Sequence, residues 1–185
     1  YEVNATVPPV EDFTYDAAGN LVRHVVDGKA RIYEWDAVNR LLAIQSDETP
    51  AEGSWRTEFA YDGLSRRVKR TEFAYDGTNW VENEGVSYLW CGTEMCQERD
   101  ENGAQVREHF IAGGFMRQGV RYFTTTDHLG SVREVADYRG DLQSRYDYTP
   151  YGEIETFVDG GTGSKFRFTG HFYHEQSRLH LTLFR

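Results

Sequence analysis

One short pattern recurs along this chain and limits its fold more than any other feature: two aromatic residues separated by one position. Residues 56–63 and 70–77 even spell the identical letters RTEFAYDG. In a β-strand, alternate side chains point to the same face, whereas in a helix they would point about 200° apart. The pattern therefore predicts strands that present both rings on one face. Seven pairs occur: Phe13/Tyr15, Tyr33/Trp35, Phe59/Tyr61, Phe73/Tyr75, Tyr88/Trp90, Tyr146/Tyr148 and Phe166/Phe168.

A turn signal follows most of these pairs. An aspartate, or in one case a threonine, precedes glycine, asparagine or serine by three positions. The side-chain oxygen can accept a backbone N–H two residues on, and glycine or asparagine tolerates the positive φ that closes such a turn. We therefore expect turns at Asp16 and Gly19, Asp36 and Asn39, Asp62 and Ser65 (the least suitable fourth residue), Asp76 and Asn79, Asp100 and Gly103, Asp127 and Gly130, Asp137 and Gly140, and Thr149 with Pro150 and Gly152.

Two-residue turn signals add further hairpins. Asp27-Gly28 separates two alternating apolar runs, and Asn102-Gly103 offers a similar turn. No window of eleven or more residues carries the apolar spacing of a helix. We predict an all-β fold of successive antiparallel hairpins with very little helix. Because both faces of several strands carry apolar residues, the sheet should curve against something or line a cavity.

Composition and charge narrow the possible partners. The chain has 185 residues, 15% of them aromatic, which favours a folded protein, and a formal net charge of −10. That charge repels nucleic acid and anionic membranes, and no apolar stretch is long enough to span a bilayer. The first residues do not form a signal peptide, and the missing initiator methionine suggests a piece of a longer protein.

The sequence gives only weak signals of a metal, redox or catalytic site. Cys91 and Cys96 have the spacing C-x4-C, which favours two ordinary thiols or one local disulfide over a metal or redox motif. Asp127, His128 and Ser131 supply the residue types of a hydrolase triad, but the exposed nucleophile motif is absent and the turn already uses Asp127. We predict no catalytic residues and no cofactor.

A zinc site near the end of the chain receives little support. His171, His174, His180 and Glu175 follow neither zincin order, and on one strand His174 and His180 would share a face while His171 points away. The acidic turns offer one carboxylate each, too few to bind calcium. The sequon at residues 4–6 matters only in a secreted eukaryotic protein.

The repeated motif resembles that of the YD-repeat, or RHS-repeat, family, roughly aromatic-x-Tyr-Asp-x-x-Gly-Arg-Leu. The matching segments are FTYDAAGNL, YEWDAVNRL, FAYDGLSRRV and FAYDGTNWV. Residues 122–173, with YFTTTDHLGSVREVADYRGDLQSRYDYTPYGE and FRFTGHFY, are similar to the RHS-associated core region. The resemblance divides the chain into an irregular lead-in (1–12), YD-repeat hairpins (13–121) and the core region (122–185).

The resemblance implies a larger hollow β-shell that encloses a C-terminal toxin polypeptide. Family members include bacterial polymorphic toxins, C components of insecticidal toxin complexes and teneurins. It implies a non-catalytic shell segment whose partners are the rest of the shell and the toxin, secreted by a dedicated system and used in bacterial competition. The family's aspartic self-cleavage site would lie beyond Arg185. His174 and Arg178 replace the family's aspartate and glycine, which weakens an expected turn.

Two other functions remain open on the residues alone. An extracellular adhesion or carbohydrate-binding module would present exposed rings, such as that of Trp35, for stacking on sugars. An enzyme would need polar residues that converge, and the sequence displays no such set.

Overall fold

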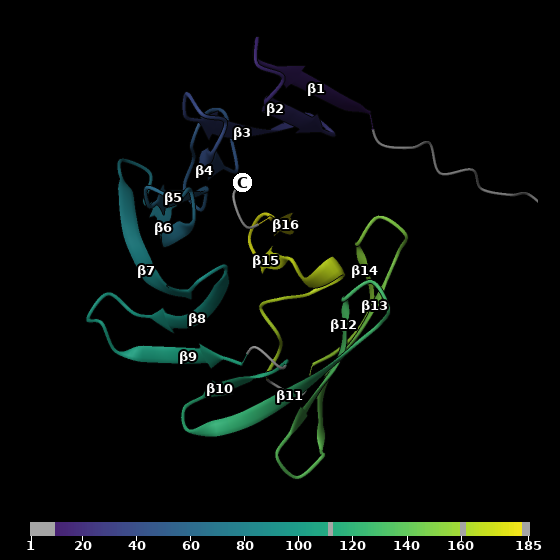
Figure 1. Ribbon diagram of the computed structural model, residues 1–185. Coiled ribbons are helices and arrows are strands. Elements are labelled where there is room, and N and C mark those ends of the chain that lie inside the picture. Colours follow the sequence, from purple (N-terminus) through teal and green to yellow (C-terminus); the bar gives the residue numbers. More distant parts are fainter. Residues whose placement is uncertain (1–9, 111–112, 160–161, 183–185) are drawn as a thin grey trace, which may run out of the picture. The chain divides into compact units, whose positions relative to one another are not determined.

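The computed structural model describes residues 10–110, 113–159 and 162–182, and these residues form almost only β structure (Figure 1). One short 3₁₀ turn, η1 (Phe168–Gly170), is the exception within these ranges. No helix in the described part of the chain could cross a membrane. The strands are β1 (Glu11–Tyr15), β2 (Leu21–Val26), β3 (Lys29–Trp35), β4 (Leu41–Gln45), β5 (Trp55–Tyr61), β6 (Arg67–Tyr75), β7 (Trp80–Cys91), β8 (Glu94–Arg99), β9 (Gln105–His109), β10 (Phe115–Arg117), β11 (Val120–Thr126), β12 (Val132–Asp137), β13 (Leu142–Tyr148), β14 (Ile154–Asp159), β15 (Phe172–His174) and β16 (Leu179–Leu181).

The strands follow one another in the sheet in chain order, from β1 to β14, while β15 and β16 form a separate pair. This antiparallel succession of hairpins confirms the predicted fold class. The chain divides into two compact units, described separately below. Unit 1 comprises the residues up to Ala60 together with Arg70–Glu84, and unit 2 comprises Tyr61–Lys69 and the residues from Gly85 onward. The motif-based boundary at residue 121 remains a prediction.

The aspartate-led turns share one pattern of hydrogen bonds. At Asp16, Oδ1 accepts the N–H of Ala18 at 2.9 Å and that of Asn20 at 2.8 Å, and the Gly19 N–H donates to the Asp16 carbonyl at 3.1 Å. The hydrogen bonds from Asn20 hold the pKa of Asp16 below its usual range. The ladder shifts register beside this turn, as in a G1 bulge. The same bonds recur at Asp36, Asp62, Asp100, Asp127 and Asp137.

The two copies of RTEFAYDG end in different turns. In the first copy Ser65, the residue least suited to its slot, adopts φ 62°, and Gly63 keeps a negative or extended φ. In the second copy Gly77 adopts φ 97°, and the Asp76 N–H donates to the Asn79 carbonyl at 3.1 Å. The expectation of positive φ at Asn79 is therefore wrong, because the turn places its left-handed residue two positions earlier, where glycine is available.

The two copies also differ in which residues they bury. In β5 Thr57 and Phe59 are buried and Glu58 is exposed, whereas in β6 Arg70, Thr71 and Glu72 are all buried. The Thr57 hydroxyl donates to the Glu72 carboxylate, and Arg70 pairs with Glu72 at 3.2 Å. Because side chains alternate with period two, a one-residue difference in alignment moves the same letters to the other face.

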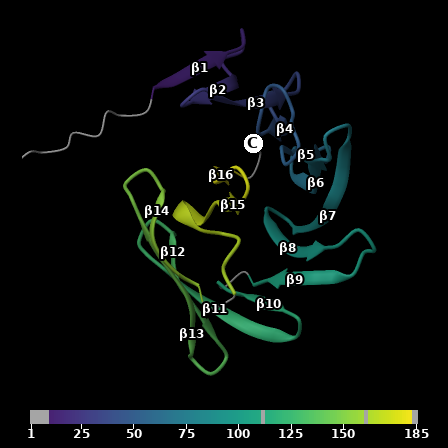
Figure 2. The same ribbon diagram turned by 180° about the vertical axis from the view of Figure 1, so that it is seen from behind.

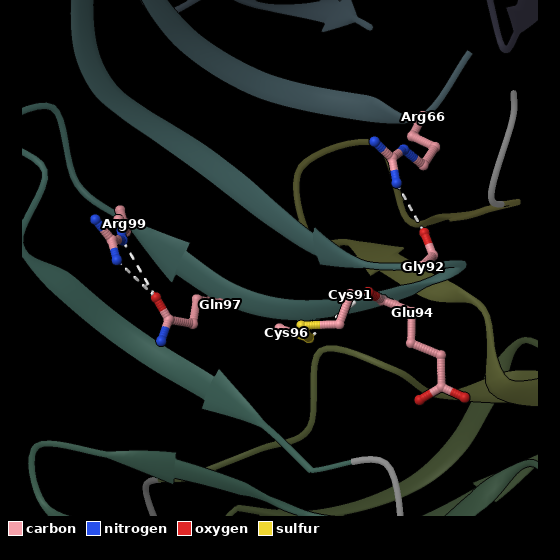
Figure 3. The surroundings of a disulfide bond; sticks show 7 residues. All are labelled: Arg66, Cys91, Gly92, Glu94, Cys96, Gln97 and Arg99. Carbon is pink, nitrogen blue, oxygen red and sulfur yellow. Dashed lines mark hydrogen bonds between the residues drawn. A yellow bond between two sulfur atoms is a disulfide. The ribbon is translucent and has the colours of Figure 1, made fainter. Parts of the chain in front are cut away.

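A disulfide joins Cys91 and Cys96 across the hairpin of β7 and β8 (Figure 3). The Arg66 Nη1 donates to the Gly92 carbonyl at 2.8 Å and links this turn to the Asp62 turn between β5 and β6. Of the two alternatives expected for these cysteines, the structure therefore contains the local disulfide.

A buried ion cluster spans β8 and β9 in unit 2. Glu98 is buried, with His109 Nε2 at 2.7 Å and Arg107 Nε at 3.7 Å from its Oε1. Burial alone would raise the pKa of Glu98, but the hydrogen bond to His109 and the positive charges of His109, Arg107 and Lys165 outweigh it and lower that pKa.

The repeated phrase supplies a matched pair of glycine substitutions. A Cβ at either Gly63 or Gly77 would meet nothing within 4 Å, so only the backbone conformation distinguishes the two sites. We expect Gly77→Ala to lower the free energy of unfolding by about 1–2 kcal/mol, because alanine resists the left-handed conformation. Gly63→Ala should be neutral or add about 0.5 kcal/mol. Urea unfolding followed by tryptophan fluorescence measures both, and equal effects would contradict the assigned turns.

Glu98 predicts a loss of stability in acid. A carboxyl whose pKa is lowered by folding adds stability above its ordinary value of 4.5, and this contribution disappears as the pH falls through the folded-state value. The free energy of unfolding should therefore decrease below about pH 4.5 in the native protein. In the Glu98→Gln variant the free energy of unfolding should be lower at neutral pH than in the native protein, and it should depend less steeply on pH. Denaturant titrations at several pH values would contradict this if the two profiles ran parallel.

Candidate functional site: the sheet face covered by the C-terminal segment

Unit 2 carries an aromatic sheet face on which residues 162–182 lie. Tyr146 and Tyr148 stand two positions apart in β13, so their rings share a face, and they stack with centroids 6.2 Å apart. Residues 162–182, drawn in yellow, lie beside these strands in both views (Figures 1 and 2). The buried cluster beneath them consists of Phe115, Val132, Val135, Tyr146 and Tyr148, with Tyr122, Ile154 and Phe168 packed against it.

Polar side chains of the sheet bind the backbone of residues 162–164. These bonds satisfy backbone groups that would otherwise be buried without partners. They therefore fix where the chain crosses the sheet. The donors and acceptors are Ser144 Oγ to the Thr162 carbonyl at 2.9 Å, Arg107 Nη1 to the Gly163 carbonyl at 3.1 Å, and the Ser164 N–H to Tyr146 Oη at 2.9 Å.

Three further bonds hold the rest of the segment. Their partners in the sheet lie at the start of β12, in the turn before β12 and in the turn before β14. Each joins a backbone group to a partner more than twenty residues away, so the segment cannot shift along the sheet without breaking them. The bonds are the Val132 N–H to the Arg167 carbonyl at 3.1 Å, the Thr169 N–H to Ser131 Oγ at 3.0 Å, and His180 Nε2 to the Gly152 carbonyl at 3.0 Å.

Arginines and rings interleave under the segment. A guanidinium above an aromatic face is attracted by the ring quadrupole, and its flat surface lets the charge be buried beside apolar groups. The buried arginines therefore fasten the segment as cations held between rings. The stacks are Arg67 over Phe172 at 5.0 Å, Arg107 over Phe115 at 4.1 Å, and Arg167 over Tyr146 at 5.1 Å and over Tyr173 at 4.1 Å.

Burial alters the ionisation of this face in the direction expected for a low-dielectric site. It raises the pKa of Tyr148, whose hydroxyl donates to the Val132 carbonyl at 2.8 Å. It lowers the pKa of Arg107 and that of His180. These shifts favour neutral tyrosine and neutral imidazole, which suits packing rather than proton transfer.

Two glycines allow the close approach of segment and sheet. A Cβ on Gly163 would lie 2.6 Å from the Tyr146 hydroxyl oxygen, and one on Gly152 would lie 2.6 Å from the Phe168 ring. Gly163 has no positive φ, so its requirement for a glycine is a matter of space. A larger residue at either position would therefore push the segment away from the sheet.

The aromatic pairs predicted from sequence divide by exposure. Phe13 and Tyr15 lie on the edge strand β1 and are exposed, although the Phe13 ring stacks on His24 at 4.4 Å. The Trp35 indole donates to the Leu21 carbonyl at 2.8 Å, which leaves its ring half-buried. Tyr33, Phe59, Tyr88, Tyr146 and Tyr148 are buried, and Tyr61, Phe73, Tyr75, Trp90, Phe166 and Phe168 are half-buried.

The strand expectation for Phe166 and Phe168 is wrong. Phe166 makes only an isolated bridge to Phe172, and Phe168 begins the 3₁₀ turn η1, in which Thr169 adopts φ 49°. Both rings still pack inward: Phe166 meets the His109 ring at 5.0 Å, and Phe168 meets the Tyr148 ring at 5.6 Å.

The triad residue types do not form a catalytic arrangement. Asp127 Oδ1 accepts the N–H groups of Leu129 and Ser131, both at 2.9 Å, and its Oδ2 pairs with Arg133. Ser131 is fully buried and its hydroxyl accepts from Thr169, while His128 is exposed. The carboxylate therefore caps a turn, and the serine positions the C-terminal segment.

The histidines do not gather either. His180 lies opposite Tyr173 and His174 opposite Leu179, so the expected shared face of His174 and His180 is wrong, because the turn between β15 and β16 changes the alignment. No group of three metal-ligating side chains occurs among the residues that the structure describes. The sequon at residues 4–6 and Arg185 lie outside those residues.

His174 instead completes a turn. The Ser177 N–H donates to His174 Nδ1 at 3.3 Å, and the Arg178 N–H donates to the His174 carbonyl at 2.8 Å. Arg178 takes the left-handed conformation, with φ 58°. The turn expected to be weakened by these two replacements therefore forms, with the imidazole nitrogen in the role of an aspartate oxygen.

Sequence reasoning missed the residues that hold the segment. Arg67, Arg107 and Arg167 were not predicted to be buried, because arginine normally indicates a surface position. A signal was available: Arg167 lies between two aromatic residues, Phe166 and Phe168, and a guanidinium stacks readily on aromatic rings.

No protein-family profile matches the chain. It is similar to two curated toxins. The double-stranded DNA deaminase toxin A of Burkholderia cenocepacia strain H111 is 24% identical over 201 residues, which cover 94% of this chain and 14% of that protein. Toxin protein Tse5 of Pseudomonas aeruginosa strain PAO1 is 26% identical over 213 residues, which cover 94% of this chain and 16% of that protein. The chain thus spans about a seventh of their length.

Solved structures share its fold. The crystal structure of TcdB2-TccC3 matches with a TM-score of 0.62 and 15% identity, over 95% of this chain and 12% of that chain. The Tc holotoxin pore of Photorhabdus luminescens matches with a TM-score of 0.54 and 14% identity, over 95% of this chain and 11% of that chain. The toxin relatives and the shared fold agree with the resemblance to the RHS/YD-repeat family that the Tyr-Asp motifs indicate.

Proposed function

We propose that this chain is a non-catalytic part of a β-shell that encloses a C-terminal toxin or another polypeptide and shields it from solvent and proteases. The observation that carries this proposal is the seating of residues 162–182 on the aromatic face of unit 2. The sheet there turns one face toward the protein's own chain, through bonds such as Tyr146 to Ser164. A face built to hold polypeptide backbone suits the wall of a container.

The turn between β11 and β12 gives no support to a catalytic role. Asp127 and Ser131 are both engaged in structural hydrogen bonds, and His128 is exposed whereas Ser131 is buried. The relatives bear the names of toxins, and we propose that their activities reside in parts of those proteins outside the matched region. We also propose that the whole protein is exported by a dedicated secretion system, as suits a toxin.

A carbohydrate-binding function has less support. Stacking on sugars requires rings that are open to solvent on one face. Among the paired rings, Phe13 and Tyr15 are exposed, but Tyr33, Phe59, Tyr88 and Tyr146 are buried, and the indole of Trp35 is fixed to the backbone of β2. We therefore keep enclosure as the proposed function.

Limited proteolysis of the full-length protein tests enclosure. In the native protein, a protease should cleave the C-terminal polypeptide about tenfold more slowly than it cleaves the same polypeptide expressed alone, because a packed wall excludes the protease. Gel and mass-spectrometric time courses measure both rates. Equal rates would overturn the proposed function.

The space around Gly163 gives a way to loosen the wall. Gly163→Ala places a methyl group against the Tyr146 oxygen, and we expect it to destabilise the seating by about 1–3 kcal/mol and to speed cleavage of the C-terminal polypeptide. Tyr146→Phe removes that oxygen, so the double variant should recover part of the loss. The control Gly63→Ala should behave like the native protein. Purely additive effects of the two changes would contradict the proposed contact.

A further inference from the structure

The disulfide in unit 2 fixes the register of the β7–β8 hairpin. Trp90 lies opposite Met95 and Leu89 lies opposite Gln97, so Cys96 is the extra residue of a β-bulge. A bulge that moved by one position would turn the side chains beside it to the other face of the sheet. The bond between Cys96 and Cys91 holds the bulge in place (Figure 3).

Two hydrogen bonds anchor the residues on either side of Cys91. The Trp90 indole N–H donates to the Arg67 carbonyl at 2.8 Å, and Arg66 Nη1 donates to the Gly92 carbonyl at 2.8 Å. Both bonds reach the start of β6, and all of these residues belong to unit 2. The position of the hairpin tip therefore bears on the position of the residues that begin β6.

Arg67 continues this connection to residues 162–182. Its side chain is buried, and its guanidinium lies over the Phe172 ring at 5.0 Å and over the Tyr88 ring at 5.9 Å. The Tyr88 ring, from β7, also meets the Phe172 ring edge-on at 5.7 Å. Phe172 is buried at the start of β15. A shift of the β7–β8 hairpin would therefore disturb both groups that hold Phe172.

The disulfide is open to a reductant. Cys91 is exposed and Cys96 is half-buried. Disulfides persist in oxidising compartments, whereas thioredoxin-type dithiols and glutathione keep thiols reduced in the cytosol. Exposed disulfides are generally more labile than buried ones. A reductant can therefore reach Cys91 while the sheet is still folded.

We propose that the Cys91–Cys96 disulfide is a site of thiol–disulfide exchange with a dithiol reductant, and that its reduction loosens residues 162–182 through Trp90 and Arg67. In the oxidised chain the hairpin tip is fixed and Phe172 keeps its ring and guanidinium partners. In the reduced chain the bulge is free to move, the bond from Trp90 to Arg67 weakens, and the seat of Phe172 loosens with it.

The exchange conserves electrons and protons. A thiolate of the reductant attacks Cys91 Sγ, the S–S bond breaks, and a mixed disulfide forms while Cys96 leaves as a thiolate and takes up a proton. The second thiol of the reductant loses its proton and attacks the reductant sulfur of the mixed disulfide. Cys91 then leaves as a thiolate and is protonated. The protein gains two electrons and two protons, and the dithiol loses both and becomes a disulfide.

Hydrogen exchange in the full-length protein tests the coupling. Oxidised protein is compared with protein treated with dithiothreitol, and peptide masses confirm the state of Cys91 and Cys96. Peptides that contain Ser164 and Thr169 report the seating, because the N–H groups of these residues donate to side chains of the sheet and its turns. Their exchange should be about tenfold faster after reduction, and reoxidation should restore the slow rate. Equal rates in the two forms would overturn the proposal.

A double variant separates this disulfide from other effects of the reductant. With Cys91→Ser and Cys96→Ser together, residues 162–182 should exchange as fast as in the reduced native protein, and dithiothreitol should not change the rate. If the double variant responds to dithiothreitol as strongly as the native protein does, the effect comes from elsewhere and the proposal is wrong.

Two tryptophans test the route. Trp90→Phe keeps the disulfide and removes the N–H that donates to Arg67, so reduction should then speed exchange by about threefold or less. Trp35→Phe removes a bond of the same kind in unit 1, from the indole to the Leu21 carbonyl at 2.8 Å, and should leave the full response. A full response in Trp90→Phe would contradict the proposed route.

The consequence for enclosure rests on the proposed function. In the reduced full-length protein, a protease should cleave the C-terminal polypeptide about tenfold faster than in the oxidised protein. If reduction loosens residues 162–182 but the oxidised protein already lets the polypeptide be cleaved freely, the exchange site stands and enclosure is wrong. If the oxidised protein protects the polypeptide and reduction leaves residues 162–182 unchanged, enclosure stands and the exchange site is wrong.

Discussion

The hydrogen bonds that each leading turn residue makes with the backbone are the interaction on which the rest of this structure depends. In the Asp127 turn one carboxylate oxygen accepts two N–H groups, and this fixes both the length of the turn and the register shift beside it. Register decides which face each ring occupies, since side chains alternate with period two. A carboxylate at a hairpin tip therefore determines what the middle of the strand buries.

This dependence explains what the sequence predicts well. The strands follow from aromatic pairs, and the turns follow from Asp-x-x-Gly, because both rest on interactions between residues less than five positions apart. The same letters predict less where a second residue can take the left-handed conformation. In the second RTEFAYDG, Gly77 takes the left-handed conformation, whereas in the first it is Ser65, three residues after the leading aspartate, that does so. Asn79, at the position that matches Ser65, therefore does not adopt a positive φ.

The site was harder to predict because its interactions are long-range. Arg107 reaches the carbonyl of Gly163, and Tyr146 accepts from Ser164, across more than fifteen residues of chain. Nothing in a local pattern says that an arginine will be buried between rings, and the usual expectation for arginine is the opposite. Phe168 shows the same limit: its ring packs as expected, but its backbone is bent by contacts of Arg167 and His171 rather than paired in a strand.

The covered face of unit 2 answers a physical problem that any single-layer sheet has. A single-layer sheet buries little of its surface and leaves edges that invite association. In unit 2, residues 162–182 supply the missing layer on one face, and buried polar groups such as Ser144 and Tyr146 position that layer as strictly as the ladder positions the strands. Because the partners of this layer come from several separate strands, its position depends on the whole of the sheet in unit 2 and not on any one hairpin.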